Sequence, residues 1–119
     1  MTEAGIHDLL APLEPVTIRR LFGGRGIYKD GRMFALAGDG ELFLKVDEET
    51  VAEFRAAGST PFIYHGGKKP IEMSYWRLPS EGYDDSAVLE RFAVLALGAA
   101  GRAKPPKKRK AAAKRKEQT

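Results

Sequence analysis

The sequence contains no cysteine, only two histidines and no long hydrophobic run. The lack of cysteine excludes disulfide bonds, thiol nucleophiles and cysteine-based zinc or iron–sulfur sites. Two histidines are too few for most metal centres. No apolar run approaches the roughly 20 residues of a membrane-spanning helix, and the N-terminal residues lack the basic start and apolar stretch of a secretory signal. We therefore expect a cytoplasmic protein that holds no metal or cofactor and does not enter a membrane.

What is present fits one folded domain followed by a cationic tail. A chain of 119 residues, 43% of them hydrophobic, is ordinary for a single globular domain. Residues 1–101 carry 11 Lys and Arg against 15 Asp and Glu, whereas residues 102–119 carry 9 against 1. Because the second segment has no large apolar side chain to bury, we predict a folded domain over 1–101 and a disordered tail over 102–119.

The first half of the domain reads as one helix and three strands. Apolar side chains recur at helical spacing over residues 4–13. A strand then runs from Val16 to Tyr28 and is expected to bend at its glycines. Two Asp-Gly pairs, at 30–31 and 39–40, are typical of type I′ turns and predict hairpins onto strands over 33–36 and 42–46. These strands form an antiparallel meander.

The second half predicts a helix, a hairpin and a long final helix. Asp47 can cap a helix over 48–57, and Gly58 is suited to end it. Residues 62–65 and 71–76 form the hairpin. Asp85 or Ser86 caps the last helix, which is expected to end near residue 100. Its apolar stripe is expected to consist of Val88, Phe92, Leu95 and Ala99, broadened by Leu89, Ala93, Ala96 and Leu97. The fold class is α+β, with two layers, an antiparallel sheet and the order α-β-β-β-α-β-β-α.

Several segments resemble the TfoX N-terminal domain family of TfoX/Sxy competence regulators. The residues that carry the resemblance are 16–24 (VTIRRLFGG), 26–28 (GIY), 30–36 (DGRMFAL), 40–47 (GELFLKVD) and 70–76 (PIEMSYW). The resemblance spans roughly residues 6–100. It implies a two-layer α/β domain with an antiparallel sheet, and a non-enzymatic co-regulator of transcription that acts through other DNA-binding factors. Longer members continue into a second, helical domain, whereas here a Lys/Arg-rich tail follows.

The tail is the clearest candidate for a functional segment. Its basic side chains can neutralise phosphates and release counterions, which gives sequence-independent binding to nucleic acid that weakens as salt rises. The tail has no aromatic residue on which a base could stack, and this argues against single-strand specificity. A solubilising tail and contact with an anionic membrane remain alternatives. The candidate nucleic-acid-binding residues are Arg102, Lys104, Lys107, Lys108, Arg109, Lys110, Lys114, Arg115 and Lys116.

Four arginines of the first strands form a candidate secondary patch for phosphate or a partner. They are Arg19, Arg20, Arg25 and Arg32. A hairpin could place Arg25 across from Arg32, although solvated strand positions paired with nearby acids explain the same pattern. The glycines beside Arg25 do not form a phosphate loop, because position 29 is Lys29 rather than glycine and no helix follows.

Tyr64 and Trp76 on the second hairpin form a possible interaction surface. Alternating aromatics in strands also pack into cores, so both interpretations stay open at this point. If one face of this hairpin is buried and the other is covered by a partner, an isologous dimer would supply the cover.

Catalysis is not expected. His65 lies beside a glycine-rich loop, but no activated nucleophile lies near it in the sequence. The acidic residues at 47–49 and 84–85 precede expected helices and are better explained by helix-start charge than by acid–base pairs. The leading hypothesis is an accessory regulatory protein that contacts nucleic acid through its tail. The alternatives are a protein-interaction or chaperone-like dimer with a dispensable tail, and, less favoured, a small-molecule enzyme.

Overall fold

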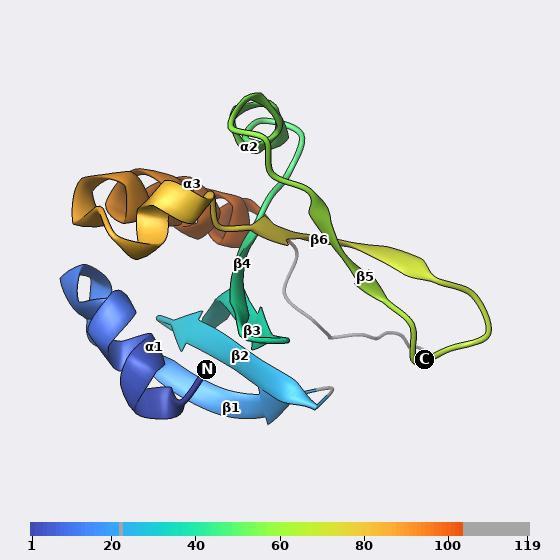
Figure 1. Cartoon of the computed structure of the whole chain (residues 1–119), viewed down its shortest axis with the longest axis horizontal. Helices are drawn as coiled ribbons and strands as arrows, with labels where there is room; N and C mark the ends of the chain where they lie inside the picture. Colours follow the sequence, from blue (N-terminus) through green and yellow to red (C-terminus); the bar gives the residue numbers. More distant parts are fainter. Residues whose placement is uncertain (22, 104–119) are drawn as a thin grey trace, which may run out of the picture.

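The computed structural model describes residues 1–21 and 23–103. It is an α+β fold with one antiparallel sheet, as predicted, and the strand order is β1-β2-β3-β4-β6-β5. Figure 1 shows α1 and α3 on the same side of the sheet, with the β5–β6 hairpin extending away from both helices. The elements are α1 (Glu3–Leu9), η1 (Ala11–Leu13), β1 (Thr17–Leu21), β2 (Gly24–Lys29), β3 (Arg32–Gly38), β4 (Glu41–Lys45), α2 (Val51–Ala56), β5 (Pro61–Tyr64), β6 (Ile71–Arg77), η2 (Ser80–Tyr83) and α3 (Ser86–Arg102).

The sheet has one more strand than the sequence predicted. The single bent strand expected from Val16 to Tyr28 is wrong, because the chain reverses and forms the hairpin of β1 and β2, with Thr17 opposite Tyr28. Gly23 has a φ of 79°, a conformation that glycine adopts without steric cost and that suits a reversal. The order is therefore α-β-β-β-β-α-β-β-α. The glycines mark a turn, rather than the bend that was expected.

Both Asp-Gly hairpins are confirmed. Asp30 and Gly31 have φ values of 53° and 78°, and Asp39 and Gly40 have 53° and 77°. Two consecutive positive φ angles define the type I′ turn, whose twist matches that of the flanking strands. These turns fix the register of β2, β3 and β4, including Ala35 opposite Leu44.

The helices differ from the sequence prediction at their ends. α1 stops at Leu9 and a 3₁₀ turn follows, because Pro12 has no N–H to continue the α-helical pattern. α2 begins at Val51 rather than at residue 48. The carboxylate of Asp47 instead accepts a hydrogen bond from the Glu49 N–H, 3.0 Å long, within the turn before the helix.

An N-terminal cap and a buried apolar face position α3 on the sheet. The Asp85 carboxylate accepts hydrogen bonds from the N–H groups of Ala87 (2.9 Å) and Val88 (3.4 Å), so Asp85 rather than Ser86 is the cap. The predicted apolar face of α3 does pack on the core, with Val88, Leu95 and Leu97 only partly buried at its margins. The buried residues are Leu89, Phe92, Ala93, Ala96, Ala99 and Ala100. The four alanines in this set let the helix approach the sheet closely.

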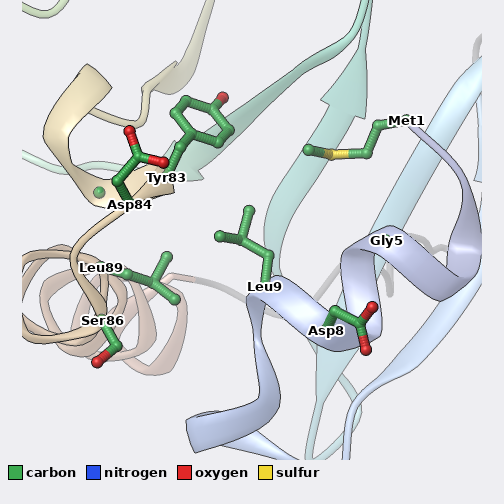
Figure 2. Close-up of a pocket in the computed structure, with 9 residues that line it drawn as sticks. Met1, Gly5, Asp8, Leu9, Tyr83, Asp84, Ser86 and Leu89 are labelled. Carbon is green, nitrogen blue, oxygen red and sulfur yellow. The ribbon is translucent and has the colours of Figure 1, made fainter.

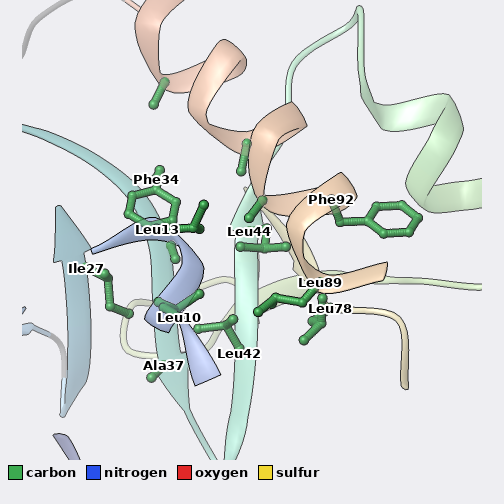
Figure 3. Packing of buried hydrophobic residues seen from close by; sticks show 14 of the residues in the cluster. Leu10, Leu13, Ile27, Phe34, Ala37, Leu42, Leu44, Leu78, Leu89 and Phe92 are labelled. Atoms are coloured by element: carbon green, nitrogen blue, oxygen red, sulfur yellow. The ribbon is translucent and has the colours of Figure 1, made fainter. Parts of the chain in front are cut away.

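The main core lies between the helices and the sheet (Figure 3). Leu10 directly after α1, Leu42 and Leu44 from β4, and Leu89 from α3 are almost fully buried. Full burial of such a side chain contributes about 1.5–3 kcal/mol to the free energy of folding. The ring of Phe92 points toward α2 and meets the ring of Phe54 edge-on at 5.0 Å, which fixes α2 against the core.

A second, smaller cluster lies on the other face of the sheet. Leu36, Phe43 and Tyr75 are buried there, with partly buried residues around them. Phe43 belongs to this cluster while Leu42 and Leu44 belong to the main core, because successive side chains of a strand point to opposite faces. The partly buried residues are Leu21, Met33, Phe62 and Met73. We call this side, with Arg19, Tyr28 and Lys45 beside the cluster, the open face.

Candidate functional site

The open face contains a hollow near the C-terminal end of α3. Its volume is about 500 Å³. Strands β1 to β4 and β6 contribute to its lining, together with the β2–β3 turn and Ala100 and Ala103 of the α3 end. The hollow therefore forms where segments far apart in the sequence meet.

Cations of the open face lie above aromatic rings. The guanidinium carbon of Arg19 is 5.5 Å from the ring centroid of Tyr28, and the Lys45 ammonium is 5.1 Å from that of Tyr75. Such geometry is attractive because the ring face is electron-rich. These contacts hold the charged groups of Arg19 and Lys45 next to the aromatic rings of the open face.

Lys45 is the most unusual of these cations. Burial lowers the pKa of its ammonium group, and nearby Asp47 partly opposes this effect. Its Nζ donates a hydrogen bond of 2.7 Å to Ser74 Oγ. No carboxylate of residues 1–21 and 23–103 lies within 4.0 Å of it. Lys45 therefore presents a partly desolvated charge without a close counterion in the described structure.

Tyr75 lies beside Lys45 and is anchored in the sheet. Its hydroxyl donates a hydrogen bond of 3.4 Å to the Met33 carbonyl. Burial, together with the nearby Tyr28, raises the pKa of Tyr75 to about 12. The phenol therefore stays neutral near pH 7, and its ring forms a fixed apolar wall.

The four predicted arginines do not form one patch. Arg19 lies on the open face, whereas Arg20 is directly opposite Arg25, whose Nε donates to Glu3 of α1 at 3.3 Å on the helix side. The expected placement of Arg25 across from Arg32 is wrong, because Arg25 pairs with Ala37 and Arg32 with Lys29. Adjacent strand residues point to opposite faces, and this alternation divides the arginines.

Arg32 holds the C-terminal end of α3. Its Nη1 donates to the carbonyl oxygens of Ala100 at 3.4 Å and Ala103 at 3.3 Å. The last carbonyls of a helix lack intrahelical partners and attract cations. Arg32 thus acts as a helix cap that also lines the hollow.

Arg102 is part of the folded domain rather than of a tail. It lies in the last turn of α3, and its Nε is 2.7 Å from Asp47 Oδ2 and 3.1 Å from Glu49 Oε2. The expectation that Arg102 lies in the disordered tail is therefore wrong, because this residue belongs to α3 and two acidic side chains before α2 engage it. The other predicted nucleic-acid-binding residues, from Lys104 to Lys116, lie outside the described residues.

The two aromatic residues of the second hairpin have different positions. Trp76 is only 7% exposed and belongs to the main core, with the Arg55 guanidinium 5.3 Å from its ring. Of the two interpretations left open, core packing is therefore confirmed for Trp76 and an exposed interaction surface is wrong, because its side of β6 faces the helices. Tyr64 is half-buried in β5, and its ring occupies the space that a side chain at Gly66 would need.

A second hollow of about 460 Å³ lies between α1 and the start of α3 (Figure 2). Asp8 and Asp84 stand on its opposite walls, with Leu9 and Leu89 between them. Within the described ranges, no group of three or more His, Asp or Glu side chains could hold a metal ion. The charged side chains in this lining, Asp8 and Asp84, are both acidic, and this disfavours an anionic ligand beside them.

Sequence reasoning missed the role of Lys45. The alternation of Glu41, Phe43 and Lys45 on one face of β4 was visible in the sequence, and it is the signal that could have identified the open face. The proximity of Lys45 to Tyr75 was not visible, because β4 and β6 become neighbours only in the folded sheet.

Together these features define a small two-layer α+β domain with one helix-covered face and one open face. The chain belongs to the TfoX N-terminal domain family, whose model matches residues 8–100. This match confirms the resemblance and supports a competence-related regulatory domain. A comparison with curated proteins finds no match. In the part of the chain that the structure describes, none of the helices has the length and apolar character needed to cross a membrane.

Proposed function

We propose that this protein is a non-enzymatic accessory regulator in the cytoplasm that contacts nucleic acid through the basic residues after α3. The observation that carries the proposal is the division of charge. Residues 1–103 carry 12 Lys and Arg against 15 Asp and Glu, whereas residues 104–119 carry 8 against 1. Phosphate contact by Lys and Arg is largely independent of sequence, so these residues would supply affinity rather than specificity.

The ion pairs of Arg102 indicate where the proposed nucleic-acid-binding segment begins. Arg102 is held by Asp47 and Glu49, so its charge already has partners within the domain. The cations available to a polyanion would then begin at Lys104, directly after the described part of the chain. The acidic balance of the domain itself would disfavour broad contact with DNA or RNA.

The open face supports contact with a protein partner or a second copy of the chain. Leu21, Met33, Phe62 and Met73 are only partly buried there, and partly exposed apolar clusters mark interaction surfaces. This favours a protein-interaction or dimerising module as a second candidate. Sedimentation of the wild type and of Met73→Glu would test it: a dimer that becomes a monomer supports the candidate, and a wild-type monomer at all concentrations contradicts it.

The positions of the histidines support a non-enzymatic role. His65 is exposed in the β5–β6 loop, and His7 pairs with Glu14. The hydrogen bond from His7 is the largest cause of a lowered pKa at Glu14. That carboxylate also accepts a hydrogen bond from the Val16 N–H at 2.9 Å. The contacts of His7 and Glu14 therefore stabilise the segment before β1, which is a structural role.

Pull-down from a lysate with and without nuclease tests the proposal. The full chain and a full-length variant with all eight Lys and Arg of 104–119 changed to Gln are compared. We expect the wild type to retain nucleic acid, and the partners bridged by it, until nuclease is added, and the variant to retain neither. Equal recovery of nucleic acid by both proteins would contradict the proposal.

A further inference from the structure

The hollow at the end of α3 has the size and lining of a small-molecule site. Ligand sites usually enclose about 300–1,000 Å³ and combine apolar walls with a few polar groups. This one is about 500 Å³. It lies between the β2–β3 turn, the middle of the open face and the α3 end.

The floor of the hollow is apolar and closely packed. Leu21, Tyr28, Met33 and Tyr75 line it. Gly26 brings three of them together, because a Cβ at that position would lie 2.7 Å from Met33 Sδ, 3.2 Å from Leu21 Cδ2 and 3.3 Å from Tyr28 Cε1. Leu21 and Met33 keep part of their surface exposed, so a bound apolar group would remove more of that surface from water.

The polar part of the lining is cationic on balance. Lys45 and Arg32 line the hollow, and Asp30 is the one carboxylate in that lining. Arg32 is fixed by the α3 carbonyls, while Lys45 makes its hydrogen bond to the neutral Ser74 hydroxyl. A single negative charge beside Lys45 would compensate the desolvation that lowers the pKa of this ammonium group.

We propose that this hollow binds a small organic monoanion, with a carboxylate at Lys45 and Arg32 and an aliphatic or aromatic body on Leu21, Met33 and Tyr75. Charge complementarity favours an external anion over residues 104–119, which carry 8 Lys and Arg against 1 Glu. The inference does not depend on nucleic-acid binding, since its residues belong to the folded domain.

Three probes with the same body test the site: 4-phenylbutyrate, 4-phenylbutanol and 4-phenylbutylamine. Each is titrated into the full-length ¹⁵N-labelled protein, and amide shifts are followed by NMR. We expect phenylbutyrate to bind most tightly and to shift amides near Asp30, Lys45 and Ala100. The neutral alcohol should bind more weakly, and the amine should not saturate.

Variants at Lys45 separate charge from packing. Lys45→Gln should weaken phenylbutyrate binding about tenfold, the size expected for losing one hydrogen bond to a charged group, and leave the alcohol unaffected. Lys45→Arg should retain most of the affinity. Lys68→Gln, an exposed loop substitution with the same change in charge, is the matched control and should bind as the wild type does.

Several results would overturn the proposal. Equal binding of the three probes, or unchanged phenylbutyrate affinity in Lys45→Gln, would show that no anion is recognised. Shifts confined to other surfaces would place the ligand elsewhere. Binding that disappears as a dimer forms at high protein concentration would assign the hollow to a second copy of the chain. The same spectra show whether each variant is folded. If Lys45→Gln is misfolded, the folded Lys45→Arg variant provides the test, and loss of its phenylbutyrate binding would contradict the proposal.

Discussion

Arg102 Nε lies 2.7 Å from Asp47 Oδ2, a contact that joins the last turn of α3 to the loop before α2 across 55 residues of sequence. The hydrogen bond from Arg102 is the largest cause of the lowered pKa of the Asp47 carboxyl. The same contact raises the pKa of the guanidinium. The end of α3 is therefore held at two points, by this pair and by Arg32.

Arg102→Gln should raise the pKa of Asp47 toward its ordinary value. Because a carboxyl with a lowered folded-state pKa adds stability above its unfolded pKa of about 4, that stability is lost as pH falls through the folded value. NMR titration of the Asp47 carboxyl carbon measures the shift directly. Arg91→Gln, the same substitution elsewhere on α3, should leave Asp47 unchanged, and an unchanged Asp47 in Arg102→Gln would refute the assigned contact.

Alkaline pH should weaken the fold through Tyr75. Its folded pKa of about 12 is raised by burial, so the phenol ionises more readily in the unfolded chain, where its pKa is about 10. Stability from this group is complete below about pH 10 and is lost as pH rises toward 12. The test compares the urea midpoint of unfolding at about pH 9 with that at about pH 11. The decrease in this midpoint should be smaller in Tyr75→Phe than in the wild type. An identical fall in both would contradict the prediction.

Gly24→Ala should destabilise the sheet. A Cβ at this position would lie 2.3 Å from the Ala37 carbonyl oxygen, and backbone of the neighbouring strand would have to move. We expect a loss of about 1–3 kcal/mol in the free energy of unfolding, measured in urea. Gly67→Ala, where the structure leaves open space, is the control and should change stability by less than about 1 kcal/mol.

Phe92→Ala should remove the contact between α3 and α2. Phe92 is 2% exposed and packs edge-on against Phe54, so the expected loss is about 3–5 kcal/mol in the free energy of unfolding. Val94→Ala on the same helix alters a side chain that is 55% exposed, and it should cost less than about 0.5 kcal/mol. Similar losses in the two variants would mean that α3 presents a different face to the sheet.

The sequence allowed prediction of features that depend on neighbouring residues. Both Asp-Gly hairpins follow from local backbone preferences, and the Asp85 cap follows from its position before an apolar helix. The glycines after β1 were ambiguous, because glycine permits either a bend or a reversal. The pairing of β1 with β2, which places Thr17 opposite Tyr28, shows that the chain reverses there.

The candidate site depended on contacts that the sequence does not display. The sequence left both an exposed and a buried position open for Trp76, and only the packing of β6 beside β4 turns it toward the helices, with Leu44 opposite. The same pairing puts Lys45 beside Tyr75 and partly buries its charge. Arg102 was assigned to the tail because its neighbours are basic, whereas its partners Asp47 and Glu49 are distant in the chain.

The salt dependence of DNA binding tests the account most directly. Affinity of the full chain for a short duplex is measured by fluorescence anisotropy over a series of KCl concentrations, beside the variant in which the eight basic residues after Ala103 are Gln. We predict that log K falls with log salt with a slope of up to about −7 for the wild type, if all eight cations are engaged, and that the variant loses measurable binding. A variant that keeps both the affinity and the slope would show that the folded domain carries the contact, and would contradict the account.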